Sequence, residues 1–194
     1  MPLERPPVLS VKPQKKTKQY LTNIAFFIVP LIIVLILRTF ILGNYSIPSS
    51  SMENTLLIGD RVVTVTESNP QRGEIVVFKD SQKWLGNSYG SDYLVKRVAA
   101  VGGDTIAGIN GQIIVNGKVL DESAYIKGNN VGPNSDFPEQ SVPQGSIFVL
   151  GDNRQNSADS RFHINAGTQF ISLDDVAGKA SVIYWPLDRI RTIH

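Results

Sequence analysis

An unbroken apolar run of 14 residues, Ile24 to Leu37, limits what this chain can fold into. Apolar neighbours extend the run to residues 21–42, provided that the long side chain of Arg38 reaches a membrane interface. A helix that crosses a bilayer needs roughly 20 residues. We therefore expect residues 21–42 to form one transmembrane anchor. The alternative is a cleaved secretory signal peptide, but no small-x-small site followed by a mature start lies nearby.

Charge is distributed unevenly along the chain. The first twenty residues hold five Lys and Arg against one acid, Glu4, and few apolar residues, so we expect residues 1–20 to be a disordered tail. The positive-inside rule keeps this tail in the cytoplasm and places residues 43–194 on the exported side. From Thr39 onward, 13 Lys and Arg stand against 16 Asp and Glu, a net charge of −3. This part of the chain therefore has no charge footprint for nucleic acid.

Short runs rich in β-branched residues, bounded by turn residues, follow the apolar segment. They are 61–66, 74–78, 93–98, 112–115, 146–150 and 180–185. Their spacing predicts that residues 43–194 form a mainly β, antiparallel domain. Asn116-Gly117 predicts a hairpin with a type I′ turn, and we read residues 121–145 as a long loop or cap. Residues 105–145 would thus form a small hairpin and cap-like insertion.

A cluster of serines lies directly after the apolar segment, in Ile47-Pro-Ser-Ser-Ser-Met52. A serine hydroxyl becomes a good nucleophile when a neighbouring base, either histidine or a neutral amine, takes its proton. The two histidines are His163 and His194, and the second is the terminal residue, where order is least expected. A Ser-His-Asp triad would therefore use His163, with Asp152 or Asp159.

Lys96 is the other candidate base. Leu94 and Val95 precede it and the apolar residues 98–101 follow Arg97, so strand alternation directs Lys96 and Arg97 to opposite faces. Burial disfavours the charged ammonium and so makes a neutral amine available near neutral pH. A solvated lysine on an edge strand is the alternative interpretation.

No metal or cofactor site is predicted. The chain has no cysteine, which excludes thiolate catalysis and cysteine-based metal sites. Its two histidines are 31 positions apart and form no His-Glu-x-x-His motif. Residues 111–118 have one residue too many for a phosphate-binding loop.

Four segments, in order, resemble the motifs of the bacterial type I signal peptidases, the membrane-bound Ser/Lys peptidases of family S26. These segments are Ser49-Ser-Ser-Met-Glu-Asn-Thr-Leu56 with Gly59-Asp60, Arg72-Gly-Glu-Ile-Val-Val-Phe78, Lys96-Arg-Val98, and Gly151-Asp-Asn-Arg-Gln-Asn-Ser-Ala-Asp-Ser-Arg161. The resemblance extends from the apolar segment to about Phe162.

This resemblance implies a function and its partners. The chain would be an endopeptidase that removes signal peptides from exported preproteins, cutting after small-x-small (Ala-x-Ala) sites without a cofactor. Its partners would be preprotein signal peptides and membrane lipid, with the translocation machinery as a further candidate. It would span a cytoplasmic or thylakoid-type membrane once, with the N-terminus cytoplasmic.

The resemblance also implies residue roles. Ser51 would be the nucleophile and Lys96 the general base, oriented by a hydrogen bond from Ser157. The Ser49 hydroxyl and the Ser51 backbone N–H would form the oxyanion hole. Asp159 and Arg161 would form a supporting ion pair, and Asp152 and Arg154 would play similar roles. The substrate-binding candidates are Tyr45, Ile47, Pro48, Met52, Leu56, Val77 and Val95, of which Leu56 and Val77 are equally expected to be core.

Two departures from the family pattern stand out. Asn54 occupies a position where a proline is common, and Ala100-Val-Gly-Gly-Asp104 replaces Gly-Leu-Pro-Gly-Asp. If the folded geometry is kept, loss of a proline mainly loosens the unfolded chain, by roughly 0.4 to 1 kcal/mol. Two rival interpretations remain: a self-cleaving repressor-type Ser/Lys peptidase, which should be soluble, and a non-catalytic, membrane-tethered β domain that binds peptides or a partner.

Overall fold

The computed structural model describes residues 23–32, 34–35, 41–86, 92–126, 128 and 131–193. The chain divides into two units, Met1–Thr39 and Phe40–His194. In the first unit, residues 23–32 and 34–35 are helical. Within the described residues, no helix has the length and apolar character that crossing a membrane requires. The predicted tail, 1–20, lies outside the described residues, as do residues 21–22, 33 and 36–40 of the predicted anchor, so both stay predictions. Residues 41 and 42, which the sequence analysis assigned to the end of the anchor, are part of a strand instead.

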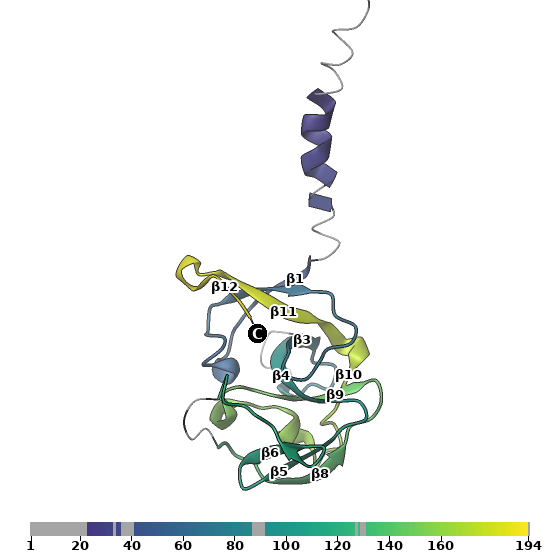
Figure 1. Cartoon of the computed structure of the whole chain (residues 1–194), viewed down its shortest axis with the longest axis vertical. Coiled ribbons are helices and arrows are strands. Elements are labelled where there is room, and N and C mark those ends of the chain that lie inside the picture. Colours follow the sequence, from purple (N-terminus) through teal and green to yellow (C-terminus); the bar gives the residue numbers. More distant parts are fainter. Residues whose placement is uncertain are drawn as a thin grey trace, which may run out of the picture. The chain divides into compact units, whose positions relative to one another are not determined.

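An antiparallel sheet of eight strands forms the body of the second unit (Figure 1). Its strand order is β1-β2-β11-β3-β4-β9-β10, and β12 pairs with β11. The strands are β1 (Ile41–Ser46), β2 (Arg61–Val65), β3 (Ile75–Lys79), β4 (Tyr93–Val101), β9 (Ser146–Leu150), β10 (Ile171–Ser172), β11 (Val176–Trp185) and β12 (Arg191–Thr192). The prediction of a mainly β, antiparallel fold is confirmed.

A second antiparallel sheet, in the order β7-β6-β5-β8, lies at the opposite end of this unit from β1 and β11 (Figure 1). Its strands are β5 (Thr105–Ile109), β6 (Gln112–Val115), β7 (Lys118–Val119) and β8 (Phe137–Ser141). Asn116 and Gly117 have φ angles of 51° and 73° between β6 and β7, as a type I′ turn requires. The interpretation of 121–145 as loop was wrong at β8, an edge strand that tolerates Pro138.

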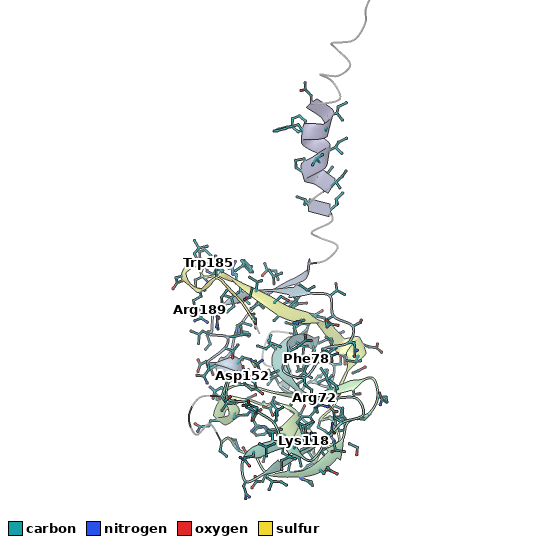
Figure 2. The ribbon with its side chains drawn as sticks, in the orientation of Figure 1. Arg72, Phe78, Lys118, Asp152, Trp185 and Arg189 are labelled. Carbon is teal, nitrogen blue, oxygen red and sulfur yellow. The ribbon has the colours of Figure 1, made fainter. Side chains whose placement is uncertain are left out.

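Burial on both faces explains the apolar sequence of β3, which lies between β11 and β4. Alternate side chains of a strand point to opposite faces. Ile75 accordingly packs into one core cluster, while Val76 and Phe78 pack into another; Phe78 lies near the centre of the unit in Figure 2. Full burial of such side chains contributes about 1.5 to 3 kcal/mol each.

A third core cluster joins the two sheets. Phe148 of β9 stacks on Phe137 of β8, with ring centroids 5.6 Å apart. Both rings belong to a cluster that also contains Ala100 of β4, Ile106 of β5 and Ile113 of β6. The smaller sheet is therefore packed onto β4 and β9.

Short 3-10 helices connect the strands. They are η1 (Ser50–Met52), η3 (Arg154–Asn156), η4 (Ser160–His163), η5 (Leu173–Asp175) and η6 (Leu187–Arg189). The first follows β1, and η3 and η4 follow β9. Met52 and Leu56 are fully buried in one core cluster, which anchors η1 and the residues after it to the large sheet.

Candidate active site

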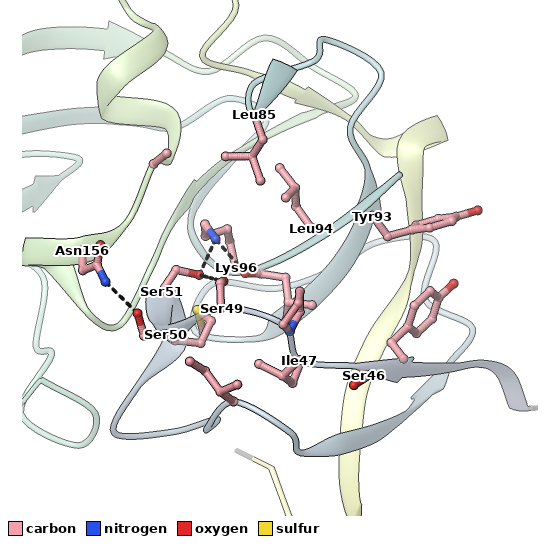
Figure 3. A pocket seen from close by; sticks show the side chains of 16 residues that line it. Ser46, Ile47, Ser49, Ser50, Ser51, Leu85, Tyr93, Leu94, Lys96 and Asn156 are labelled. Carbon is pink, nitrogen blue, oxygen red and sulfur yellow. Dashed lines mark hydrogen bonds between the residues drawn. The ribbon is translucent and has the colours of Figure 1, made fainter. Parts of the chain in front are cut away.

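A cleft of about 340 Å³ is lined by residues from β1, η1 and β4 (Figure 3). Among its described lining residues, Lys96 is the only Lys, Arg, His, Asp or Glu. The lining residues are Tyr45, Ser46, Ile47, Pro48, Ser49, Ser50, Ser51, Met52, Ile58, Leu85, Tyr93, Leu94, Val95, Lys96, Asn156 and Ala158. The cleft thus has apolar walls, a group of hydroxyls and one amine.

Ser51 and Lys96 meet inside this cleft. Lys96 Nζ lies 2.7 Å from Ser51 Oγ and 3.1 Å from the carbonyl oxygen of Val95 (Figure 3). Ser51 is held in η1 and Lys96 in β4, where it stands opposite Val76 of β3. Both residues are buried, and Lys96 is only 4% exposed. A rigid sheet therefore holds the amine against a hydroxyl.

The surroundings of Lys96 increase the fraction of its neutral form relative to a solvated lysine. Burial lowers the pKa of the ammonium from its ordinary value to about 8, and the negative charges of Asp159, Asp152 and Asp80 oppose this shift. Desolvation wins because the hydrogen-bond partners of Nζ are neutral oxygens. With that pKa, about one tenth of the amines are neutral at pH 7. Such an amine can accept the proton of a serine hydroxyl.

Two further serines surround Ser51. The Ser49 hydroxyl donates a hydrogen bond to Ser51 Oγ at 3.3 Å. Asn156 Nδ2 donates to Ser50 Oγ at 2.6 Å, and the backbone N–H of Asn153 donates to the carbonyl oxygen of Ser51 at 3.1 Å. The segment after β9 therefore holds η1 from the side opposite β4.

Ser157 is buried beside Ser51, but it lacks the hydrogen bond to Lys96 that the sequence analysis expected. Its Oγ has no hydrogen-bond partner among the described residues, and the amine donates to Ser51 Oγ and to the Val95 carbonyl oxygen. Gly151 leaves room for this packing. A Cβ atom at Gly151 would lie 2.1 Å from Ser157 Oγ and 2.5 Å from the Ser51 carbonyl oxygen.

Asp159 and Arg161 form the ion pair that the sequence predicted. Arg161 Nε donates to Asp159 Oδ1 at 2.8 Å and Nη2 donates to Oδ2 at 2.9 Å, with both side chains fully buried. Asp159 also accepts a hydrogen bond from the backbone N–H of Gly151. Because removing one partner would leave an uncompensated buried charge, this pair fixes the segment that carries Ser157.

Asp152 connects the elements on both sides of the cleft. It accepts two hydrogen bonds from Arg97, each at 2.8 Å, and a third from the Thr55 hydroxyl at 2.5 Å. Arg97 follows Lys96 on β4, and Thr55 lies four residues after Ser51. Asp152, labelled in Figure 2, therefore ties η1, β4 and the end of β9 together.

Arg154 pairs with an acid that the sequence analysis did not select. Its guanidinium forms an ion pair with Glu122, on the segment between β7 and β8. Tyr125 of the same segment places its ring 4.0 Å from the Arg97 guanidinium. Only long-range packing brings these side chains together, so no local pattern could have identified Glu122.

Five of the seven predicted substrate-binding residues line the cleft: Tyr45, Ile47, Pro48, Met52 and Val95. Leu56 and Val77 do not, because both are 0% exposed in the interior of the domain. Residues missed by the sequence analysis are Ser46, Ser50, Ile58, Leu85, Tyr93, Leu94, Asn156 and Ala158. Strand alternation could have found Tyr93, which lies two residues before Val95 and so on the same face.

His163 packs against Trp84 and, within the described residues, makes no hydrogen bond to Ser51. Its ring stacks on Trp84, with centroids 4.4 Å apart and an interplanar angle of 8°. Its Nε2 has no hydrogen-bond partner among the described residues. The base that contacts Ser51 is therefore Lys96, while the other histidine, His194, lies outside the described residues.

Asn54 corrects one sequence-based expectation. Its φ angle is 86°, whereas the proline ring fixes φ near −65°. The geometry of a proline is therefore not kept at this position. The departure from the family pattern changes the folded turn after η1, and not only the unfolded chain.

Comparisons with known proteins show the family to which this chain belongs. The family model described as signal peptidase, peptidase S26, matches residues 20–185. A probable signal peptidase I-2 of Synechocystis is 37% identical over 158 residues, 79% of this chain and 68% of that protein. A signal peptidase I P of Bacillus subtilis subsp. natto is 33% identical over 192 residues, 93% of this chain and 97% of that protein. A solved signal peptidase I from Enterococcus faecalis V583 is 24% identical, with a TM-score of 0.42, covering 58% of this chain and 97% of that one.

The relatives and the family model define an enzyme class, the serine endopeptidases of the signal peptidase I type. The chain belongs to the signal peptidase family, peptidase S26, a membrane-associated family that removes signal peptides from preproteins.

Proposed function

We propose that this chain cuts preproteins after small-x-small sites with a Ser51/Lys96 dyad. The observation that carries the proposal is the buried contact of 2.7 Å between Lys96 Nζ and Ser51 Oγ, together with the lowering of the Lys96 pKa to about 8. A base poised near the working pH is what general-base catalysis requires.

The reaction proceeds in two steps. Neutral Lys96 takes the proton of the Ser51 hydroxyl while Oγ attacks the carbonyl carbon of the scissile bond. The tetrahedral oxyanion accepts hydrogen bonds from the Ser49 hydroxyl and the Ser51 backbone N–H. The C–N bond then breaks, and the Lys96 ammonium returns the proton to the leaving amine. A water then gives a proton to Lys96 and attacks the carbonyl carbon of the acyl-enzyme. The bond from this carbon to Ser51 Oγ breaks, and Lys96 returns the proton to Oγ.

Ser157 orients the amine in this proposal. When Lys96 is an ammonium it has three N–H donors, and two of them have acceptors in Ser51 Oγ and the Val95 carbonyl. The Ser157 hydroxyl is buried without a partner, and an unsatisfied buried hydroxyl costs about 1 to 3 kcal/mol. It supplies the third acceptor once the proton has moved to the amine.

The substrate binds as an added strand. β9 pairs with β4 only from Arg97 to Val101, and no described strand pairs with residues 94–96 on that side. β1 is likewise an edge strand of the large sheet. An extended peptide between these two edges makes main-chain hydrogen bonds. Its alternate side chains, at the first and third positions before the cut, then enter the apolar space between Ile47 and Val95, to which we assign the preference for small residues.

The membrane is the second proposed partner. Four apolar side chains are exposed in two segments: Ile58 in the turn before β2, and Trp185, Leu187 and Ile190 from the end of β11 to just past η6. Arg189 and Asp60 connect these segments by an ion pair, and Trp185 and Arg189 lie at the same end of the β unit in Figure 2. Exposed apolar side chains gathered in this way mark interaction surfaces. We place them against lipid, on the exported side of a single-pass protein. The translocation machinery is proposed only as the source of the preprotein.

Cleavage of a model preprotein with an Ala-x-Ala site, in detergent, tests the dyad. Wild type should cut after the second alanine, and Ser51→Ala and Lys96→Met should be inactive. Lys79→Met, which removes an exposed lysine from β3, is the matched control and should remain active. Activity of Lys96→Met together with inactivity of His163→Ala would instead establish the histidine triad.

A further inference from the structure

The end of the cleft away from Ser51 is built from two tyrosines. Tyr45 of β1 and Tyr93 of β4 both line the cleft, with ring centroids 5.2 Å apart and planes inclined at 56°. Figure 3 shows Tyr93 toward one end of the cleft and Asn156 toward the other, with Ser51 and Lys96 between them. Tyr93 is 39% exposed, so its ring is accessible to a ligand.

Both tyrosines lie in register with residues of the proposed substrate pockets. Tyr45 precedes Ile47 by two residues, and Tyr93 precedes Val95 by two residues. Each pair therefore shares one face of its extended segment. Two residues of extended chain span about 7 Å. The two tyrosines thus form a second pair on the same faces as Ile47 and Val95, two residues along each strand and further from Ser51.

The same periodicity identifies the substrate residue that reaches the tyrosines. In an added strand, the side chains at the first, third and fifth positions before the cut point to one side. If the first and third flank Ile47 and Val95, then Tyr45 and Tyr93 flank the third and the fifth. The third position is restricted to small residues, so the fifth is the one that can contact both rings.

The chemistry of this subsite is apolar and uncharged. Burial, assisted by Tyr93, raises the pKa of the Tyr45 phenol above its ordinary value, so this ring stays neutral at physiological pH. Lys96 is the only Lys, Arg, His, Asp or Glu among the described residues that line the cleft, and it lies three residues along β4 from Tyr93. Aromatic rings of this kind offer large apolar contact area with few rotamers to restrict.

We infer that Tyr45 and Tyr93 form a specificity subsite for a bulky apolar side chain at the fifth position before the cut. The inference rests on the proposed cleavage of preproteins by Ser51 and extends it to a position beyond the small-x-small rule. Contact with two half-exposed rings removes about half of a leucine side chain from water. It should favour leucine over serine at that position by about fivefold in kcat/KM.

Two model preproteins, identical except for Leu or Ser at the fifth position before one Ala-x-Ala site, test this inference. The full chain in detergent should show the fivefold preference for Leu. Tyr93→Ser should reduce the Leu/Ser ratio of kcat/KM to about one, whereas Tyr93→Phe should keep it because the ring remains. Phe162→Ser is the matched control, since Phe162 is 41% exposed and does not line the cleft.

The possible failures differ from one another. Equal cutting of both preproteins by wild type would overturn the subsite while leaving the proposed function intact. An unchanged ratio in Tyr93→Ser, or the same loss in Phe162→Ser, would also overturn it. Failure of folded wild type to cut either preprotein would overturn the proposed function and the subsite together.

Discussion

Replacing Lys96 by Met should stabilise the protein at neutral pH, although it removes the proposed catalytic base. Burial holds the pKa of the folded ammonium near 8, against an ordinary value of 10.5. At 1.36 kcal/mol per pKa unit, the folded state loses about 3 kcal/mol at pH 7 relative to an unshifted lysine. Methionine fills a similar volume without a charge. It gives up the two hydrogen bonds of Nζ, worth about 1 kcal/mol each, so a net gain of about 1 kcal/mol is expected.

The pH dependence of this difference is the sharper test. Because the folded pKa is depressed, the unfolded state binds more protons between pH 8 and 10.5, and wild-type stability rises with pH through that window. Between pH 7 and pH 10, the free energy of unfolding of the wild type should rise by about 2 to 3 kcal/mol relative to that of Lys96→Met. Other titrating groups are common to both proteins and cancel in the difference.

Urea unfolding of the full chain in detergent, followed by the fluorescence of the buried Trp84, measures this difference. Lys79→Met is the control, because it removes an exposed lysine from the neighbouring strand β3. A difference between wild type and Lys96→Met that stays constant from pH 7 to pH 10 would refute the reasoning, since it would mean that Lys96 is as well solvated in the folded state as in the unfolded one.

Three further outcomes are expected. The value of kcat/KM for preprotein cleavage should rise about tenfold per pH unit below pH 8 and level off above it, because only neutral Lys96 accepts the proton; a flat profile from pH 6 to pH 9 would exclude this base. Asn54→Pro should lower the free energy of unfolding by at least about 1 kcal/mol, because proline cannot adopt a φ of 86°, while Asn54→Gly should be nearly neutral in the same urea titration. Gly151→Ala should abolish cleavage and lower the unfolding midpoint, since its Cβ would overlap Ser157 Oγ and the Ser51 carbonyl oxygen; an active, stable variant would contradict the close packing.

The parts of the fold that depend on local sequence could be predicted. β2, β3, β6 and β9 follow runs of β-branched residues, and their bounds agree with the predicted ranges to within a residue. The Asn116-Gly117 turn could also be predicted, because a type I′ turn has positive φ angles at both central residues and Asn-Gly is strongly preferred there.

Elements that depend on their neighbours could not be predicted in the same way. β1 begins at Ile41, where the sequence continues the apolar run and therefore looked like the end of an anchor. β8 contains Pro138 and three polar residues, so only its position at a sheet edge reveals it as a strand.

The candidate site likewise contains residues that the sequence could identify and others that depend on the fold. Ser51 and Lys96 were identified because the order of the motifs suggested them, and their contact in the structure is direct. Whether Val77 lines a pocket or the core depends on which strands cover β3, which sequence alone does not determine. The pairing of Arg154 with Glu122, 32 positions apart, likewise exists only in the folded chain.

β9 does not pair with the stretch of β4 from Leu94 to Lys96. This unpaired edge is relevant to how one enzyme can act on many substrates. Amide groups are the same in every polypeptide, so an edge that holds its ligand through main-chain hydrogen bonds accepts unrelated sequences with similar strength. Discrimination then falls to the few side chains that face the cleft walls. A peptide that occupies this edge should inhibit cleavage of the substrate. Methylation of its main-chain nitrogens that face the edge should abolish this inhibition, whatever side chains the peptide carries.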